Sequence, residues 1–146
     1  MEQRIILVDD DRDDRELFAD AFASLRLQAE LLLFQNGREL FEQIDRIDRS
    51  VLTFMFLDLN MPVISGMEVL KHIRQRSEWD KVFITIYSTS YSEADIESAY
   101  HNGAHGYLSK PSSFGKLTSL IAKTLTIATS GKMKPLPKDR FVLNRE

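Results

Sequence analysis

The sequence predicts an α/β fold, in which a doubly wound parallel sheet carries helices on both faces. Three observations predict it: short continuous apolar runs alternate with amphipathic stretches of helical period, the connections between them are short, and 146 residues suit one domain. The apolar runs show no two-residue alternation, which is typical of strands buried on both faces.

The predicted elements alternate as strand and helix, five times over. The strands are residues 5–8, 31–34, 54–57, 82–87 and, as a short edge strand, 106–108. The helices have apolar stripes at Leu17, Phe18, Ala21, Phe22 and Leu25; at Leu40, Phe41, Ile44 and Ile47; at Met67, Leu70 and Ile73; at Ile96, Ala99 and Tyr100; and at Leu117, Leu120, Ile121 and Leu125. Ser92 with Asp95 predicts the start of the fourth helix, and Asn102-Gly103 predicts its end.

Composition excludes several classes of protein. The absence of cysteine excludes disulfides and thiolate zinc sites, and the net charge of −3 disfavours generic binding to nucleic acid or to anionic membranes. No apolar run approaches the roughly 20 residues of a membrane span, and the acidic N-terminal region is not typical of a signal peptide. We therefore expect a cytoplasmic protein with no direct DNA binding and no membrane association.

The charge also divides the chain. Residues 131–146 contain five basic and two acidic residues, a net charge of +3, whereas the preceding part has 14 basic and 20 acidic residues. With Gly131, Pro135 and Pro137, this segment is typical of an appendage rather than a regular element. We interpret the chain as a domain of residues 1–130 followed by a basic C-terminal tail of residues 131–146.

Polar side chains follow the predicted strands at their carboxyl ends, where open α/β sheets place their ligand sites. Asp9 and Asp10 follow the first strand, Asp58 ends the third, Ser88 ends the fourth and Lys110 follows the fifth. Clustered carboxylates without His or Cys suit a hard cation such as Mg²⁺. A divalent cation, a lysine and a hydroxyl around a carboxylate match the needs of phosphoryl transfer, with an aspartyl phosphate as product.

Other polar residues have simpler interpretations. Asp11, Asp13 and Asp14 at the start of a helix are expected to cap it or to face solvent. The three histidines, His72, His101 and His105, are expected on the surface, and none is assigned to metal binding or phosphotransfer.

These residues together resemble the receiver domain of two-component response regulators, over residues 4 to about 127. The motifs are Asp9-Asp10, the stretch Leu57-Asp58-Leu59-Asn60-Met61-Pro62 with Gly66, Ser88 thirty residues after Asp58, and Lys110-Pro111 fifty-two residues after it. The stretch from Ser88 to Ile96 looks most similar to stand-alone receivers such as those serving bacterial phytochromes.

The resemblance implies the flavodoxin-like (βα)5 receiver fold with strand order 2-1-3-4-5. It implies phosphorylation of Asp58 by a phosphohistidine of a sensor histidine kinase or a histidine phosphotransfer protein. Asp9, Asp10, Asp58 and the backbone carbonyl of Asn60 would bind Mg²⁺ or Mn²⁺, and of the pair Asp9-Asp10 it is Asp10 that is expected to contact the ion directly.

The same resemblance assigns a switch. Lys110 and Ser88 would contact the phosphoryl group, and Tyr107, three residues before the lysine, would turn from an exposed to a buried position after transfer. The output would be a changed contact with a downstream protein. Such a protein is not a conventional enzyme, although it catalyses its own phosphotransfer and a slow autodephosphorylation.

Three other classes of protein lack the residues that they need here. A haloacid-dehalogenase-type phosphatase would need an acid at Asn60, a flavodoxin-like electron carrier would need a phosphate loop without five aspartates, and a dinucleotide fold would need a Gly-x-Gly-x-x-Gly turn. The remaining alternative is a receiver-fold interaction module that acts without phosphorylation.

Two further expectations concern geometry. The resemblance predicts a cis peptide bond between Lys110 and Pro111. The basic tail, with the apolar segment 141–143, predicts a contribution to a homodimer through docking on an acidic surface of the same chain or of a second copy.

Overall fold

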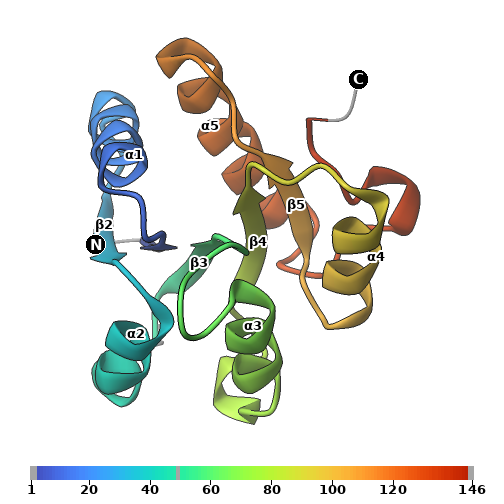
Figure 1. Ribbon diagram of the computed structural model, residues 1–146. Coiled ribbons are helices and arrows are strands. Elements are labelled where there is room, and N and C mark those ends of the chain that lie inside the picture. Colours follow the sequence, from blue (N-terminus) through green and yellow to red (C-terminus); the bar gives the residue numbers. More distant parts are fainter. Residues whose placement is uncertain (1–2, 49, 145–146) are drawn as a thin grey trace.

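The computed structural model describes residues 3–48 and 50–144, and it contains one five-stranded parallel sheet between two layers of helices (Figure 1). The strands are β1 Gln3–Val8, β2 Ala29–Phe34, β3 Leu52–Leu57, β4 Phe83–Ser88 and β5 Gly106–Ser109. They are ordered β2-β1-β3-β4-β5, which confirms the predicted fold class and strand order.

Helices follow each strand. The α-helices are α1 Arg12–Ser24, α2 Gly37–Gln43, α3 Gly66–Arg74, α4 Glu93–His101 and α5 Phe114–Ser130, and the 3₁₀ helices are η1 Ile44–Arg46, η2 Ser77–Trp79 and η3 Lys138–Arg140. Figure 1 shows α1 and α5 on one face of the sheet and α2, α3 and α4 on the other. Among the described residues, no helix combines the length and the apolar character needed to cross a bilayer.

Alternate residues of each strand supply two cores. In β1, Ile5 and Leu7 pack toward α1 and α5, whereas Ile6 and Val8 pack toward α2 and α3. All four side chains are fully buried, which explains why the sequence of this strand shows no alternation of apolar and polar residues.

Side chains at the first position before each α-helix fix where it begins. Each cap accepts a hydrogen bond from the backbone N–H three residues later, and the caps are Asp11, Asn36, Ser65, Ser92 and Ser113. Each bond satisfies one backbone donor that the first turn of a helix leaves free. The predicted Ser92 start of α4 is confirmed. The helix ends at His101, with Asn102 as its C-cap and then Gly103, whose φ of 94° favours glycine.

The segment after α5 packs along the outer edge of β5. Tyr107 N–H donates to the Phe141 carbonyl at 3.0 Å, and Leu143 N–H donates to the Tyr107 carbonyl at 2.9 Å. The Asn144 side chain bonds both the N–H and the carbonyl of Ser109, at 3.1 and 2.7 Å. Residues 141–143 are therefore buried on their own chain.

The described part of the tail also forms an ion pair with the domain. Lys138 Nζ lies 2.8 Å from Glu97 of α4, as expected for a basic segment on an acidic surface. Arg145 and Glu146, which the charge analysis counted in the tail, lie outside the described residues. The division into a domain of residues 1–130 and a tail stays a prediction.

Two sequence-based expectations are wrong. The Lys110–Pro111 bond is trans, since the described residues contain no cis peptide bond; Lys110 N–H donates to the Ser88 carbonyl at 2.8 Å and its side chain reaches the carboxylates from this backbone. His105 is buried rather than on the surface, because the chain turns at Gly103 and returns beside β4, where His105 N–H donates to the Ile84 carbonyl at 2.8 Å. The centroid of the imidazole ring lies 4.8 Å from that of Phe83.

Candidate functional site

The parallel register brings the first acidic pair beside the predicted acceptor. Val8, the last residue of β1, lies opposite Leu57, the last residue of β3. Asp9 follows Val8, and Asp58 follows Leu57. Asp58 N–H donates to the Val8 carbonyl at 3.0 Å, which continues the ladder past the end of the strands. The two carboxylates therefore leave the sheet at the same edge.

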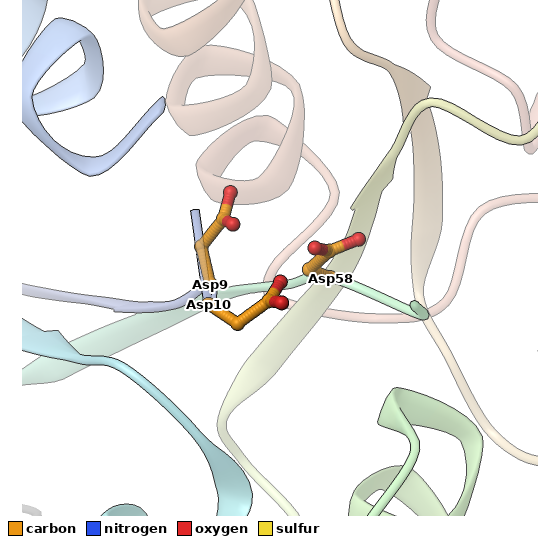
Figure 2. A group of neighbouring side chains, drawn as sticks. All are labelled: Asp9, Asp10 and Asp58. Atoms are coloured by element: carbon orange, nitrogen blue, oxygen red, sulfur yellow. The ribbon is translucent and has the colours of Figure 1, made fainter. Parts of the chain in front are cut away.

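Three carboxylates form one cluster at this edge. Oxygens of Asp9, Asp10 and Asp58 all lie within 4.8 Å of one another, and Figure 2 shows the three side chains together at the ends of β1 and β3. Asp9 and Asp58 are buried, whereas Asp10 is exposed. The structure thus brings together three of the predicted metal ligands.

The loop after β3 is held close to the acceptor. Gly66 N–H donates to the Leu59 carbonyl at 2.9 Å, and a Cβ atom at Gly66 would lie 1.9 Å from the Asp58 carbonyl oxygen. No side chain fits there, so the glycine is required by a close approach of two backbone segments. This approach fixes the backbone that carries Asp58 and Asn60.

Burial and crowding of like charges disfavour the ionised carboxylates. Burial raises the pKa of Asp58 to about 7; the charge of Lys110 opposes this increase, whereas the charges of Asp9 and Asp10 add to it. Burial also raises the pKa of Asp9 above its ordinary value, against the effect of Lys110. A cation at this cluster would relieve both effects.

Lys110 reaches the cluster from the end of β5. Its Nζ lies 2.8 Å from Asp9, 2.8 Å from Asp14 and 3.5 Å from Asp58, and its side chain is only 8% exposed. Burial by itself lowers the pKa of the ammonium, but the hydrogen bonds to Asp14 and Asp9 and the charges of Asp9 and Asp58 hold that pKa above its ordinary value. The lysine is therefore a fixed positive charge beside Asp58.

Ser88 and Tyr107 belong to one chain of hydrogen bonds that starts at Asn60. The Asn60 amide donates to Ser88 Oγ at 3.5 Å, Ser90 N–H donates to the same oxygen at 3.2 Å, and Tyr107 Oη donates to the Ser90 carbonyl at 2.9 Å. Tyr107 is fully buried, and Phe141 lies against its ring. The inward position expected after phosphoryl transfer is the position in this structure, and the rotation stays a prediction.

Two residues at the site were not predicted. Asp14 was interpreted as a capping or solvent-facing residue, but its carboxylate bonds Lys110. Tyr87 places its ring beneath Lys110, with Nζ 5.4 Å from the ring centroid. Asp11 is the helix cap as expected and Asp13 is exposed. The position of Tyr87 directly before Ser88 was the one available signal; nothing in the local sequence distinguishes Asp14 from Asp13.

The donor set fits a hard divalent cation. Three carboxylates converge, all of their donor atoms are oxygen, and no histidine or cysteine belongs to the cluster among the described residues. Mg²⁺ and Mn²⁺ favour such ligands, and Mg²⁺ completes its shell with water. Asp9, Asp10 and Asp58 would hold the ion by this chemistry.

Comparison with known sequences identifies the family. Residues 5–122 match the family described as response regulator receiver domain, so the chain belongs to that family, which acts in two-component signal transduction. The chain is 29% identical over 120 residues to the probable methanogenesis regulatory protein FilR2 of Methanothrix harundinacea, covering 80% of this chain and 77% of the relative. It is 26% identical over 121 residues to response regulator Rcp1 of Synechocystis, covering 80% and 82%. Other relatives are longer, and the chain spans 38% of one and 24% of another.

Solved structures show the same fold. The phosphorylated cyanobacterial phytochrome response regulator RcpA superposes with a TM-score of 0.78 at 24% identity, covering 90% of this chain and 96% of that one. The response regulator TrrA of Thermotoga maritima, solved in complex with Mg²⁺-BeF, has a TM-score of 0.66 at 26% identity, covering 84% and 98%. The chain is therefore similar to receivers, including one that serves a phytochrome.

Proposed function

We propose that the chain is the phosphoaccepting switch of a two-component phosphorelay, which takes a phosphoryl group from a phosphohistidine onto Asp58. The observation that carries this proposal is the placement of Asp58 between two other carboxylates and the buried ammonium of Lys110. The donor would be a sensor histidine kinase or a histidine phosphotransfer protein. The similarity to phytochrome response regulators makes a phytochrome-type kinase the first donor to test, and a cytoplasmic location is part of the proposal.

The proposed transfer replaces one bond with another. An oxygen of the ionised Asp58 carboxylate forms a bond to phosphorus while the phosphorus–nitrogen bond of the donor breaks. The imidazole nitrogen leaves with the electron pair and takes a proton from solvent. Lys110 Nζ, now 3.5 Å from Asp58, would bind one phosphoryl oxygen, and the Ser88 hydroxyl would bind another. A bound Mg²⁺ or Mn²⁺ would neutralise charge on the phosphoryl oxygens.

The proposed output uses the hydrogen-bond chain from Ser88 to Tyr107. If Ser88 Oγ turns to the phosphoryl group, it releases the Ser90 N–H whose bond it now accepts, and Ser90 also carries the carbonyl that holds Tyr107. The face formed by α4, β5 and α5 would change, and with it the affinity for a downstream protein.

Phosphorylation by a small phosphodonor such as acetyl phosphate, with Mg²⁺, tests the function. Intact-mass spectrometry should show one phosphoryl group on the wild type and none on Asp58→Asn, with Asp20→Asn, an exposed aspartate of α1, behaving as the wild type. Stoichiometric labelling of Asp58→Asn would reject the acceptor. An unlabelled wild type that still binds its partner would favour the phosphorylation-independent interaction module.

The metal site has a separate test. Asp10→Ala should weaken Mn²⁺ binding, measured by calorimetry, and also abolish labelling, because few protein ligands hold a strongly hydrated ion. Unchanged Mn²⁺ binding in Asp10→Ala would move the metal site to other carboxylates.

The homodimer also stays a proposal. Because residues 141–143 are buried on their own chain, a second copy would have to contact the exposed basic residues of the tail instead. Light scattering should give a dimer mass for the full chain and a smaller mass for the charge-reversal variant Lys132→Glu/Lys134→Glu, in which both altered residues are exposed. A monomer mass for both proteins would reject the dimer.

A further inference from the structure

The contact between Asp14 and Lys110 crosses from α1 to the end of β5. Asp14 Oδ2 accepts a hydrogen bond from Lys110 Nζ at 2.8 Å, over a separation of 96 residues in the sequence. The Asp14 side chain is 34% exposed and that of Lys110 is 8% exposed, so solvent only partly screens this ion pair. The contact is closer than the one between Lys110 and the proposed acceptor, Asp58.

The position of the ammonium is restricted on several sides. Three carboxylates surround it, those of Asp9, Asp14 and Asp58, and the ring of Tyr87 lies beneath it. Tyr87 is itself fixed, since its ring packs edge-on against Phe18 and Phe56 with centroids 5.7 and 6.3 Å apart. A movement of Lys110 toward Asp58 therefore competes with its two shorter contacts, those to Asp9 and Asp14.

Helix capping does not account for the contact. Asp13 and Asp14 both lie in the first turn of α1, where a negative charge favours the helix dipole. Asp11 already provides the cap, by accepting from Asp14 N–H at 2.9 Å. Asp14 bonds the lysine, whereas Asp13 is exposed, so the two neighbours separate the role in the helix from the contact with Lys110.

We propose that Asp14 is a positioning residue for Lys110, which holds the ammonium on the α1 side of the site and thereby weakens the binding of a phosphoryl group at Asp58. This inference rests on the proposed function, because it assumes that Lys110 binds the phosphoryl group. Asp14 and the phosphoryl oxygens compete for the same donor, so the strength of the Asp14 bond sets part of the stability of the phosphorylated state.

Binding of beryllofluoride, a phosphoryl mimic, in the presence of Mg²⁺ tests the competition without a chemical step. Asp14→Asn should bind beryllofluoride roughly three- to fivefold more tightly than the wild type, the effect of an ion pair at the upper end of the range for partly exposed pairs. Asp13→Asn, which removes an equal charge from the same helical turn, should bind as the wild type does. Asp14→Ala is the second neutral variant and should show the same gain as Asp14→Asn.

The outcomes separate this inference from the function on which it rests. A wild type that binds no beryllofluoride would overturn both. Binding by the wild type with no gain in either Asp14 variant, or with weaker binding, would overturn the positioning role and leave the function standing. An equal gain in Asp13→Asn would show a general charge effect and would also overturn it.

Discussion

Lys110 and Arg74 lie at opposite ends of the sheet, and their charges are neutralised in different ways. Lys110, at the carboxyl ends of the strands, lies among carboxylates. Arg74 lies at the other end, where its guanidinium donates to the carbonyls of Gly103, Trp79 and Val82 at 2.8 to 3.2 Å and contacts His105 Nδ1 at 2.7 Å. Burial lowers the pKa of Arg74 to about 10, so it remains charged at neutral pH.

The difference distinguishes a cation whose contacts can change, Lys110, from one whose contacts are fixed, Arg74. Carbonyl dipoles belong to the backbone and cannot leave Arg74, which therefore ties α3 to the segments on either side of β4 as long as the protein is folded. Carboxylates can exchange a lysine for another cation, so the contacts of Lys110 can be redistributed by a metal ion or a phosphoryl group. Four predictions test this comparison.

Arg74→Met should give the largest loss of stability. The substitution keeps the apolar stem but removes the donors to three carbonyls, and we expect the free energy of unfolding to fall by about 2–4 kcal/mol. Urea denaturation measures the change, with Arg76→Met as the control, because the guanidinium of Arg76 pairs with the exposed carboxylate of Asp45 at 3.0 Å. Beryllofluoride binding should not change, and a weakened phosphoryl-mimic site in Arg74→Met would contradict the division of roles.

Lys110→Ala should act mainly on the binding of the phosphoryl mimic. Loss of a buried charge-assisted hydrogen bond to the mimic should weaken beryllofluoride binding about ten- to a hundredfold. Mg²⁺ affinity, measured by calorimetry, should be equal to that of the wild type or higher, because a positive charge has left the carboxylate cluster. A loss of Mg²⁺ binding would mean that the lysine supports the site rather than competes with the ion.

His105, which contacts Arg74, should make the stability of the protein sensitive to acid. Burial, and then the charge of Arg74, lower the pKa of His105 to about 3, from 6.5 for an unperturbed histidine. Below about pH 6.5 the imidazole binds a proton in the unfolded chain but stays neutral in the folded protein. The stability that the neutral imidazole contributes is therefore fully present above about pH 6.5 and is lost as the pH falls toward 3. Between pH 7 and pH 5 this effect should lower the free energy of unfolding by about 2 kcal/mol.

Comparison with His105→Gln isolates the effect of His105 on the pH dependence of the free energy of unfolding. The raised pKa values of Asp9 and Asp58 change this pH dependence in the opposite direction, but they are common to both proteins. The exposed His101, which pairs with Glu97 at 3.0 Å, provides the control variant His101→Gln. Parallel stability curves for the wild type and His105→Gln from pH 7 to pH 5 would show that His105 is not held neutral.

Asp80→Asn should have the smallest effect. Asp80 is exposed, and its charge favours the charged form of Arg74. If backbone carbonyls neutralise the guanidinium, losing this carboxylate should change the free energy of unfolding by less than about 0.5 kcal/mol in urea denaturation. A larger loss would mean that Arg74 depends on a charge, as Lys110 does.

Features that depend on periodicity and strand register were predictable from the sequence. The apolar runs predicted the strands. Strand ends at Asp9 and Asp58 were sufficient to predict a carboxylate pair, because the carboxyl ends of parallel strands lie at the same edge of the sheet. The capping residue Ser92 was predictable because its hydrogen bond lies within four residues of sequence.

Contacts between distant segments were not predictable in this way. Asp14 and Asp13 look alike in sequence, and only the packing of α1 against α5 decides which of them meets Lys110, the residue after β5. His105 is buried because Gly103 turns the chain and Arg74, 31 residues away, supplies a donor.

The C-terminal segment has a consequence for handling the protein. An outer strand with unpaired N–H and carbonyl groups is a template on which other molecules can add strands, and aggregation often starts there. Here those groups of Tyr107 and Ser109 are paired with Phe141, Leu143 and Asn144. A shortened chain that stops after α5, or where the family match ends at residue 122, would bare this strand beside the apolar surface that residues 141–143 now cover. We therefore expect residues 141–144 to prevent β5 from pairing with strands of other molecules.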